Sequence, residues 1–484
     1  MKLENRKWTE DEFFAMRKEV LGQWPTGKEV EDINEGIEFC KKLPPTKNTH
    51  LKQELSEKLG VIQLLPQVGH GTFELTLDHI KYVEPTKPEL WIIYSDAYTR
   101  KNKYEQAQIG IDRSHKEGFS VLSGYPIVNY GVKPTRELVE ANDAAFYYNA
   151  SDADARLAVE IALASGITGF PEHPIQEMFQ HAKDFPMDIR LQYSQYTSRL
   201  EAYYEEHGVP IEALSAANLS GWDHPGFKVT LAILQGLIPV TQGCKNICLT
   251  FGQSMSLIQD TAARRAALKL FKEYAGKFGH PDVDLCTKTF PWLGVWPLDE
   301  GQSEAMVAWN ATTSILGGFD KQTVKSINEA HATPVKEGNF EAMRICRQLL
   351  NIMGNQRLPE SAELSLEQEM IEKEARATVD KTIEMGDGDL LVGIVKAIGA
   401  GVLDTIYSPY HLVKKDVLLV RDNHGAIRYL KHGNLPLPKE VIEYNQERIA
   451  EREKVEGAKA DIDMVINDTI FPSRHFTELV PAYK

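Results

Sequence analysis

The feature of this sequence that most constrains its fold is a recurring alternation of short apolar runs with amphipathic stretches between residues 61 and 327. The apolar runs are rich in β-branched and aromatic residues, which is typical of buried strands, and the stretches between them have helical spacing. Such repeated strand–helix units predict parallel strands joined by right-handed crossovers. The strand candidates are 61–68, 90–97, 120–126, 144–150, 167–170, 211–217, 246–252, 283–290 and 319–327.

This alternation favours an α/β fold of the (β/α)8, or TIM-type, barrel. The sequence offers nine strand candidates, one more than a barrel uses. Either one assignment is wrong or one strand lies outside the barrel, and the short run 167–170 is the weakest candidate. A doubly wound open sheet is the alternative fold, but no GxGxxG fingerprint opens the first strand–helix turn.

The regions that flank the repeat differ from it in composition and in residue spacing. Residues 1–60 are polar and lysine-rich, and their spacing predicts an N-terminal helical segment before a catalytic barrel at 61–359. Residues 360–484 predict a C-terminal α+β region packed on the barrel. This region begins in a long charged helix pattern and continues with a hairpin at 417–430 and a second charged helix at 438–457.

Composition excludes some classes of protein. The formal net charge is -15, which disfavours a general binder of nucleic acid or of anionic membranes, so any cationic site must be local. The start of the chain has no apolar signal-peptide region, and no run approaches the ~18 apolar residues of a membrane helix. We expect a cytoplasmic protein that contacts neither membranes nor nucleic acid.

The cysteines agree with a reducing compartment. The five cysteines are scattered, odd in number and without a CxxC pair, so free thiols are expected rather than disulfides. Cys244 and Cys248 are interpreted as small buried residues rather than metal ligands, and no metal site is expected in this chain.

Active sites of such barrels lie at the carboxyl ends of the strands, so the polar residues that follow the strand candidates are the candidates for chemistry. Arg100 could clamp a carboxylate, or form an ion pair on the next helix. Glu172 beside His173 could act as a base or a ligand, or be a solvated loop pair. Lys325 and Glu329 have the spacing of a plain helical ion pair. These residues indicate a barrel enzyme but name no reaction.

Several long segments together resemble one family. The chain is similar, from about residue 5 to about residue 472, to the large epsilon-type chain of glutamate mutase, also called methylaspartate mutase. The segments that carry the resemblance are QWPTGKEV (23–30), SDAYTRKNKYE (95–105), GYPIVNYGVK (124–133), EAYYEEHGV (201–209), VKSINEAHATPVKE (324–337), GDGDLLVGIVKAIGAGVLD (386–404) and VRDNHGAIRYLKHGNLP (420–436).

The resemblance implies a fold, a cofactor and a partner. The large chain of this family is a (β/α)8 barrel that forms a homodimer within a heterotetramer, with adenosylcobalamin between it and a small cobalamin-binding chain carrying D-x-H-x-x-G. Homolysis of the Co–C bond starts a radical 1,2-shift that converts L-glutamate to L-threo-3-methylaspartate, so the enzyme is an isomerase. The present chain lacks that motif, since Asp422-Asn423-His424-Gly425 has the wrong spacing, and a separate small partner is therefore implied.

The resemblance also implies contacts with the adenosyl group and its ribose. Gly69 matches a family glycine after the first strand, and Lys325 and Glu329 match a lysine and a glutamate four residues apart. Trp296 matches an aromatic residue in kind. Ser123 stands where the family has an asparagine, and Thr333 where it has an isoleucine.

The implied substrate pocket departs much further from the family. Of three arginines that bind the substrate carboxylates, only Arg100 is present, and the other two positions hold Gln67 and Asn149. The family glutamate that meets the substrate amine aligns with Pro171, so the adjacent Glu172 is the catalytic candidate. Two pocket tyrosines are replaced by Glu177 and His181.

These replacements change what the pocket would bind. A charge-assisted hydrogen bond to a carboxylate contributes about 1.5–3 kcal/mol, so two losses would weaken glutamate binding by orders of magnitude. We therefore expect a different amino acid, such as one with a single carboxylate on Arg100 and a cationic or polar group near Glu172 and Glu177.

Two other functions stay open. The chain could be a non-catalytic paralogue that serves the cobalamin-binding subunit as an assembly or regulatory partner, because its substrate residues have changed. A cobalamin-free barrel lyase is a further alternative.

Overall fold

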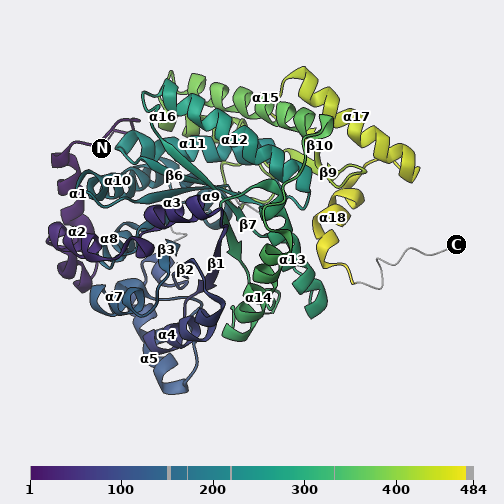
Figure 1. Ribbon diagram of the computed structural model, residues 1–484. Coiled ribbons are helices and arrows are strands. Elements are labelled where there is room, and N and C mark those ends of the chain that lie inside the picture. Colours follow the sequence, from purple (N-terminus) through teal and green to yellow (C-terminus); the bar gives the residue numbers. More distant parts are fainter. Residues whose placement is uncertain (1, 150–153, 172, 218–220, 332, 476–484) are drawn as a thin grey trace.

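Eight parallel strands close into a barrel at the centre of the computed structural model, with helices around it (Figure 1). The structure describes residues 2–149, 154–171, 173–217, 221–331 and 333–475. Strand β1 pairs with β2 and also with β8, which closes the sheet, so the predicted (β/α)8 barrel is confirmed and the open sheet is excluded. The strands are β1 (Gln63–Val68), β2 (Leu90–Tyr94), β3 (Ala145–Asn149), β4 (Gly169–Pro171), β5 (Glu212–Ala217), β6 (Asn246–Gly252), β7 (Asp284–Phe290) and β8 (Lys321–Val324).

The surplus strand candidate is 120–126, and the prediction that 167–170 was the weakest is wrong. Strand β4 is short, but it pairs with β3 and β5 and so completes the barrel. Gly169 leaves room there for the ring of Tyr147, which a Cβ atom would meet at 1.9 Å. The segment 120–126 is a loop that crosses the end of β2, where the Tyr125 amide donates to the Tyr94 carbonyl at 2.7 Å.

The barrel helices follow the strands in order, and several begin at side-chain caps. Thr72, Ser256 and Asp299 each accept a hydrogen bond from a backbone amide in the first turn of α4, α12 and α13. These helices are α4 (Phe73–Val83), α5 (Tyr104–Glu117), α6 (Ile127–Tyr130), α7 (Val132–Glu140), α8 (Arg156–Ala164), α9 (Pro174–His181), α10 (Met187–Glu206), α11 (Pro225–Gln242), α12 (Leu257–Lys277), α13 (Glu300–Gly317) and α14 (Lys336–Met353).

Before β1 the chain forms α1 (Glu10–Leu21), α2 (Ile33–Lys42) and α3 (Thr49–Leu59). Helices α1 and α2 lie against one side of the barrel, next to α8, and α1 also contacts α10, whereas α3 contacts β3 (Figure 1). A buried ion pair fastens them there, because Arg17 of α1 donates from Nε to Glu160 of α8 at 2.9 Å. Short 3-10 turns lie at Pro25–Val30, Pro45–Lys47, Glu84–Thr86, Thr99–Lys101 and Phe471–Ser473.

After the barrel come α15 (Ala362–Met385), α16 (Leu390–Ala400), the hairpin β9 (Val417–Arg421) and β10 (Ile427–His432), α17 (Lys439–Glu456) and α18 (Ile462–Ile470). The strands of the hairpin are antiparallel, as the Asn-His-Gly turn predicts. Helix α15 lies along α11 and α12 (Figure 1). Glu374 of α15 accepts from Tyr429 of the hairpin at 2.6 Å and pairs with His224, the N-cap of α11, at 2.7 Å.

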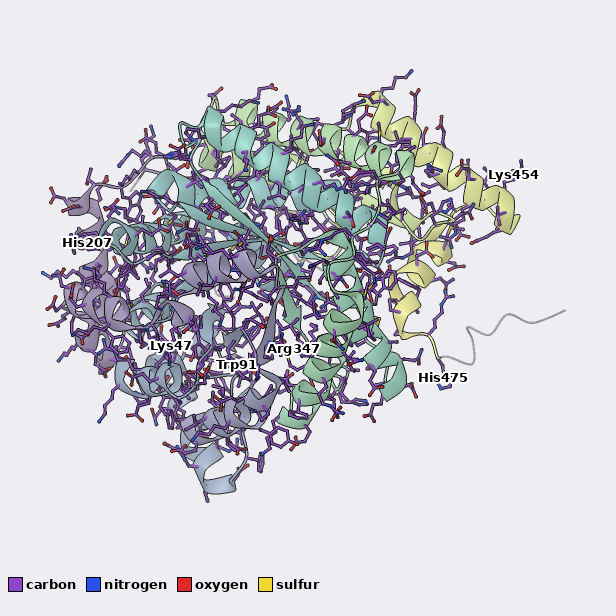
Figure 2. The ribbon with its side chains drawn as sticks, viewed as in Figure 1. Lys47, Trp91, His207, Arg347, Lys454 and His475 are labelled. Atoms are coloured by element: carbon purple, nitrogen blue, oxygen red, sulfur yellow. The ribbon has the colours of Figure 1, made fainter. Side chains whose placement is uncertain are left out.

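Side chains fill the space between strands and helices (Figure 2). The labelled Trp91 of β2 packs there against His79 of α4, with ring centroids 6.3 Å apart. All five cysteines are buried and free, as expected. Within the described ranges, none of the helices combines the length and the apolar character needed to cross a membrane.

Candidate functional site

Two adjoining cavities open at the carboxyl ends of the barrel strands. The axial cavity, about 450 Å³, is lined by residues of several strands, among them Tyr94 of β2, Asn149 of β3, Ala216 of β5 and Phe290 of β7. The side cavity, about 230 Å³, lies beside it at the end of β1. Tyr94 and Arg100 line both cavities, so the two spaces meet at these side chains.

Most of the predicted residues line these cavities, whereas Lys325 and Trp296 line neither. Gly69, Ser123, Glu329 and Thr333, predicted to contact the cofactor, line the side cavity together with Gln67. Arg100, Asn149 and His181, predicted to bind substrate, line the axial cavity. Glu177 lines a third cavity of about 680 Å³, which it shares with Arg100 and His181. Glu172, the catalytic candidate, lies outside the described residues.

Arg100 is held on the short turn after β2. The carboxylate of Asp96 accepts from the Tyr98 amide at 2.8 Å and fixes this turn. The Nε of Arg100 donates to the carbonyl of Ser95 at 3.0 Å. Arg100 makes no ion pair with any described residue, so the alternative of an ion pair on the next helix is not observed there. Its terminal nitrogens are thus available to a carboxylate, for which the planar fork of donors is suited.

The two positions at which the resemblance implies a lost arginine, Gln67 and Asn149, lie around one tyrosine. Gln67 donates from Nε2 to the Tyr94 hydroxyl at 2.9 Å, and Asn149 hydrogen-bonds the same side chain. Burial raises the pKa of Tyr94 and outweighs the opposing effect of Asn149, so the phenol is neutral. Gln67, Tyr94 and Asn149 therefore form a network of neutral hydrogen-bonding groups.

His173 and Glu177 form a buried pair on α9. The Nε2 of His173 lies 2.8 Å from Oε1 of Glu177, and both side chains are at most 5% exposed. The other ring nitrogen of His173 and Oε2 of Glu177 have no hydrogen-bond partner within the described ranges. Burial acts to raise the pKa of Glu177, but the hydrogen bond and charge of His173, with His181 and Arg190, lower it. Glu177 is therefore an anion in a buried setting.

Lys325 and Glu329 form an ion pair, with Nζ 2.5 Å from Oε1, across a turn rather than along a helix. The pair belongs to the rim of the side cavity, since Glu329 lines that cavity. The Lys325 ammonium also lies 5.4 Å from the ring centroid of Trp296, whose Nε1 donates to the Trp292 carbonyl at 2.8 Å. Lys325 thus lies between the carboxylate of Glu329 and the aromatic ring of Trp296.

Gly69 is required by packing. A Cβ atom there would lie 2.8 Å from the Tyr94 carbonyl oxygen and 3.1 Å from the Tyr125 nitrogen. The ends of β1 and β2 and the loop at 120–126 therefore touch through backbone atoms. This close approach brings Ser123 to the edge of the side cavity.

Sequence reasoning missed one charged residue of the axial cavity, Lys288 of β7. Its side chain is 3% exposed and lines the cavity. Burial lowers its pKa to about 8. The available signal was the alternation of β7, in which Cys286, Lys288 and Phe290 share one face and that face points into the barrel.

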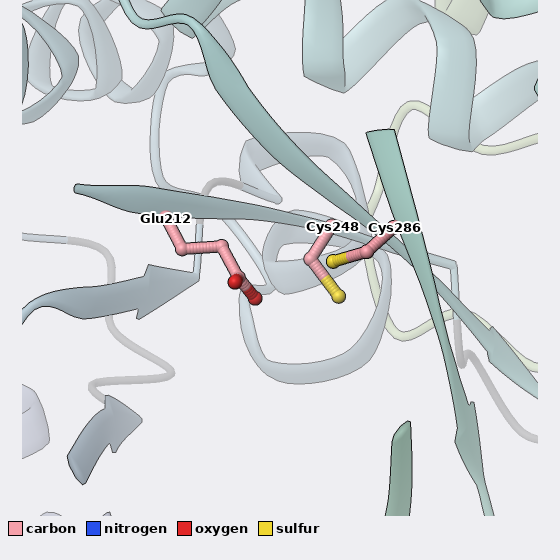
Figure 3. A group of neighbouring side chains, drawn as sticks. All are labelled: Glu212, Cys248 and Cys286. Atoms are coloured by element: carbon pink, nitrogen blue, oxygen red, sulfur yellow. The ribbon is translucent and has the colours of Figure 1, made fainter. Parts of the chain in front are cut away.

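A second polar group lies further down the barrel. Glu212, Cys248 and Cys286 point toward one another, with candidate metal-binding atoms within 4.8 Å (Figure 3). However, Lys321 of β8 donates to both oxygens of Glu212, at 2.6 and 2.5 Å. Its ammonium supplies the charge that a metal would bring, and burial raises the pKa of the Cys286 thiol. We interpret Glu212 and Lys321 as a structural ion pair, named here the barrel floor.

Comparisons with known proteins agree on one family. The family model described as methylaspartate mutase E chain (MutE) matches residues 43–475. A curated protein of Desulfitobacterium hafniense named glutamate mutase epsilon subunit is 37% identical, over 97% of each chain. Proteins of the same name are 36% identical in Escherichia coli O157:H7, over 97% of each chain, and 31% identical in Haloarcula marismortui, over 96% of this chain and 94% of that one.

Among solved structures the likeness is distant. A DAHP synthase from Thermotoga maritima aligns with a TM-score of 0.35 and 8% identity, over 61% of this chain and 71% of that one.

Proposed function

The chain belongs to the methylaspartate mutase E chain family, and from this premise we propose that it is the catalytic subunit of an adenosylcobalamin-dependent carbon-skeleton mutase acting on an amino acid. The observation that carries the proposal is the pair of adjoining cavities that meet at Tyr94 and Arg100. A substrate in one cavity and a cofactor group in the other would touch at this junction, as a transfer between them requires.

The residues of the side cavity fit an adenosyl group. Glu329, fixed by Lys325, offers a carboxylate to the hydroxyls of a ribose, and Ser123 and Thr333 offer further hydrogen bonds. Trp296, whose ring lies 5.4 Å from the Lys325 ammonium, would add an apolar face near this ion pair. When bound, adenosylcobalamin supplies a carbon-centred radical that abstracts hydrogen from the substrate.

The residues of the axial cavity orient the substrate and exclude water. Arg100 would hold a carboxylate at the junction of the cavities, and Tyr94 and Asn149 would offer neutral hydrogen bonds, with Gln67 of the side cavity bonded to the Tyr94 hydroxyl. The remaining lining is mostly aromatic and aliphatic, including Tyr147, Phe290 and Leu214. A lining of this kind suits reactive chemistry because it keeps water from the reacting atoms.

The buried pair His173–Glu177 is a candidate to receive a substrate amine, since Glu177 is anionic and has a free oxygen within the described ranges. Glu172 remains a candidate for the same role from its position in the sequence. A separate small subunit with a D-x-H-x-x-G motif would carry the cobalamin, and two copies of each chain would form the heterotetramer.

A non-catalytic paralogue is the weaker candidate. A chain kept only to hold its partner would not need a half-buried arginine, without an ion pair to any described residue, where two cavities meet. The polar side chains among the lining of both cavities therefore favour an enzyme over an assembly factor.

The direct test is to combine the chain with a small cobalamin-binding subunit and adenosylcobalamin, and to add a panel of amino acids. We expect a cob(II)alamin signal by electron paramagnetic resonance together with a rearranged amino acid. The matched control is Glu329→Gln, which should weaken cofactor binding without unfolding the barrel. A complex that binds the cofactor but gives neither signal nor product with any amino acid would contradict the proposal.

A further inference from the structure

Lys288 occupies the middle layer of the barrel interior. Strand β7 alternates, so that Lys288 faces the axis between Cys286, which lies beside the barrel floor, and Phe290, which lines the axial cavity. The ring centroid of Tyr147 is 5.2 Å from the Lys288 ammonium. The side chain therefore reaches the cavity from its deep end.

Lys288 differs from every other buried lysine in the described part of the chain. Those others each have oxygen partners: Lys47 the Val139 carbonyl, Lys228 the Gly221 and Gly252 carbonyls, Lys321 the Glu212 carboxylate and Lys325 the Glu329 carboxylate. Lys288 has no hydrogen bond and no ion pair with any described residue. The nearby Glu212 carboxylate pairs with Lys321 instead, and no hydrogen bond or ion pair joins it to Lys288.

A buried ammonium without a partner is unfavourable because it has lost its water and gained no anion. Burial, which removes this water, lowers the pKa of Lys288 to about 8. Mutual Coulomb attraction with an incoming anion would be strong in such a weakly polarisable setting. The free protein thus holds a charge whose missing counterpart has to enter through the cavity.

The lining of the axial cavity has one sign of charge. Arg100 and Lys288 are its Lys and Arg residues, and His173 and His181 also line it. No aspartate or glutamate lines it among residues that the structure describes. The two cations come from different sides, one from the turn after β2 and one from β7.

We propose that Lys288 is a specificity-determining residue that binds a second anionic group of the ligand, so that the axial cavity takes a small molecule with two carboxylates, one on Arg100 and one on Lys288. The inference rests on the proposed function only for the statement that this ligand is the substrate. It revises the expectation of a single carboxylate, because Lys288 replaces from β7 a charge that Gln67 and Asn149 no longer supply.

The test is direct binding to the full chain by isothermal titration calorimetry, without cofactor or partner. The probes are two acids and their side-chain amides, L-glutamate with L-glutamine and glutarate with glutaramate. Each pair has the same length and differs in one charge. We expect at least one acid to bind tenfold or more tightly than its amide, and Lys288→Met to remove this preference. Lys288→Arg should keep part of it.

Thermal unfolding separates this role from a structural one. Lys288→Met removes an unpaired buried charge and should leave the melting temperature equal or higher, whereas a residue kept for the fold would lower it. The matched control, Lys321→Met, should lower the melting temperature because it leaves Glu212 unpaired.

Equal binding of acid and amide, no binding of either acid, or unchanged acid binding in Lys288→Met would overturn the proposal. Its failure is distinct from failure of the mutase function. Acid-selective binding without cob(II)alamin formation would support Lys288 and contradict the mutase, whereas turnover with an unchanged KM in Lys288→Met would do the reverse.

Discussion

Two lysines of neighbouring strands, Lys321 of β8 and Lys288 of β7, lie in adjacent parts of the same barrel and have opposite surroundings. Lys321 is fully buried and closes an ion pair with Glu212. Lys288 is buried nearly as deeply but faces the axial cavity without a partner among the described residues. The comparison shows that burial alone does not tell whether a charged side chain serves the fold or a ligand. The position of its counter-ion does. A counter-ion inside the protein stabilises the fold, and a missing one points to a ligand.

The largest expected effect tests the barrel floor. Lys321→Met leaves the Glu212 carboxylate buried and unpaired, so it should lower the free energy of unfolding by about 3–5 kcal/mol. Chemical denaturation at pH 7 measures this change. Lys288→Met is the matched control and should show no such loss. Equal destabilisation by both substitutions would remove the distinction between the two lysines.

The next effect concerns the other cation of the axial cavity. Arg100→Met should weaken binding of the amino-acid substrate by about 1.5–3 kcal/mol, which is roughly 10- to 150-fold in Kd, because a charge-assisted hydrogen bond is lost. Calorimetry on the full chain measures it. Arg100→Lys should recover part of the loss, since it keeps the charge but not the fork of donors. Unchanged affinity in Arg100→Met would mean that the cavity does not hold a carboxylate there.

A pH titration sharpens the comparison further. Lys288 binds an anion only when it is protonated. Since its pKa in the free chain is about 8, the neutral form predominates above that pH. Affinity for a dicarboxylate should therefore be nearly constant below pH 7 and fall about tenfold by pH 9. This fall in affinity between pH 7 and pH 9 should be absent in Lys288→Met. The other charged or titratable groups that act on Lys288 are Glu212, Lys321, Cys248 and Cys286.

The sign of the same shift gives a stability prediction. Since burial lowers the folded-state pKa of Lys288 from 10.5, protonation favours the unfolded chain. The stability that the neutral amine contributes at high pH is lost as pH falls from about 10.5 through about 8. The difference in unfolding free energy between Lys288→Met and the unchanged chain should therefore grow over this interval and level off below it. A difference that shrinks toward neutral pH would contradict this assignment.

The smallest expected effect tests the side cavity. Glu329→Gln removes the charge that faces the predicted ribose but keeps a hydrogen-bond acceptor, so adenosylcobalamin should bind about threefold to tenfold more weakly. The complex with the small subunit is titrated spectroscopically. Dicarboxylate binding to the chain alone should not change. If the variant instead loses affinity for the amino acid, the side cavity does not bind the cofactor separately from the substrate, and the proposed assignment is wrong.

Much of the fold could be predicted from the sequence because the barrel repeats one simple pattern. The alternation of apolar runs with helical stretches fixes the barrel class, and the Asn-His-Gly turn fixes the hairpin. The strand prediction was wrong at two places: 120–126 is a loop, and 167–170, expected to be the weakest candidate, overlaps β4. A loop that packs tightly on a strand end can be as apolar as a strand, whereas β4 needs few residues because Gly169 and its neighbours pair on both sides.

The candidate site was only partly predictable. Arg100, Glu329 and Gly69 follow from the family resemblance, and the structure brings them to two adjoining cavities. Lys288 could not be found in that way, because transfer from a family considers only positions already known to matter. A lysine within a strand pattern also looks like a solvent-facing residue until the closed barrel shows which face points inward.

The measurement that tests this account most directly compares L-glutamate and L-glutamine as triggers of the assembled system. The chain, a small cobalamin-binding subunit and adenosylcobalamin are mixed, and cob(II)alamin is followed by electron paramagnetic resonance. Our account predicts a signal with the dicarboxylic amino acid at concentrations where its amide gives none, and a matching loss in Lys288→Met. A signal from the amide but not from the acid, or equal signals in the Lys288→Met variant, would contradict it.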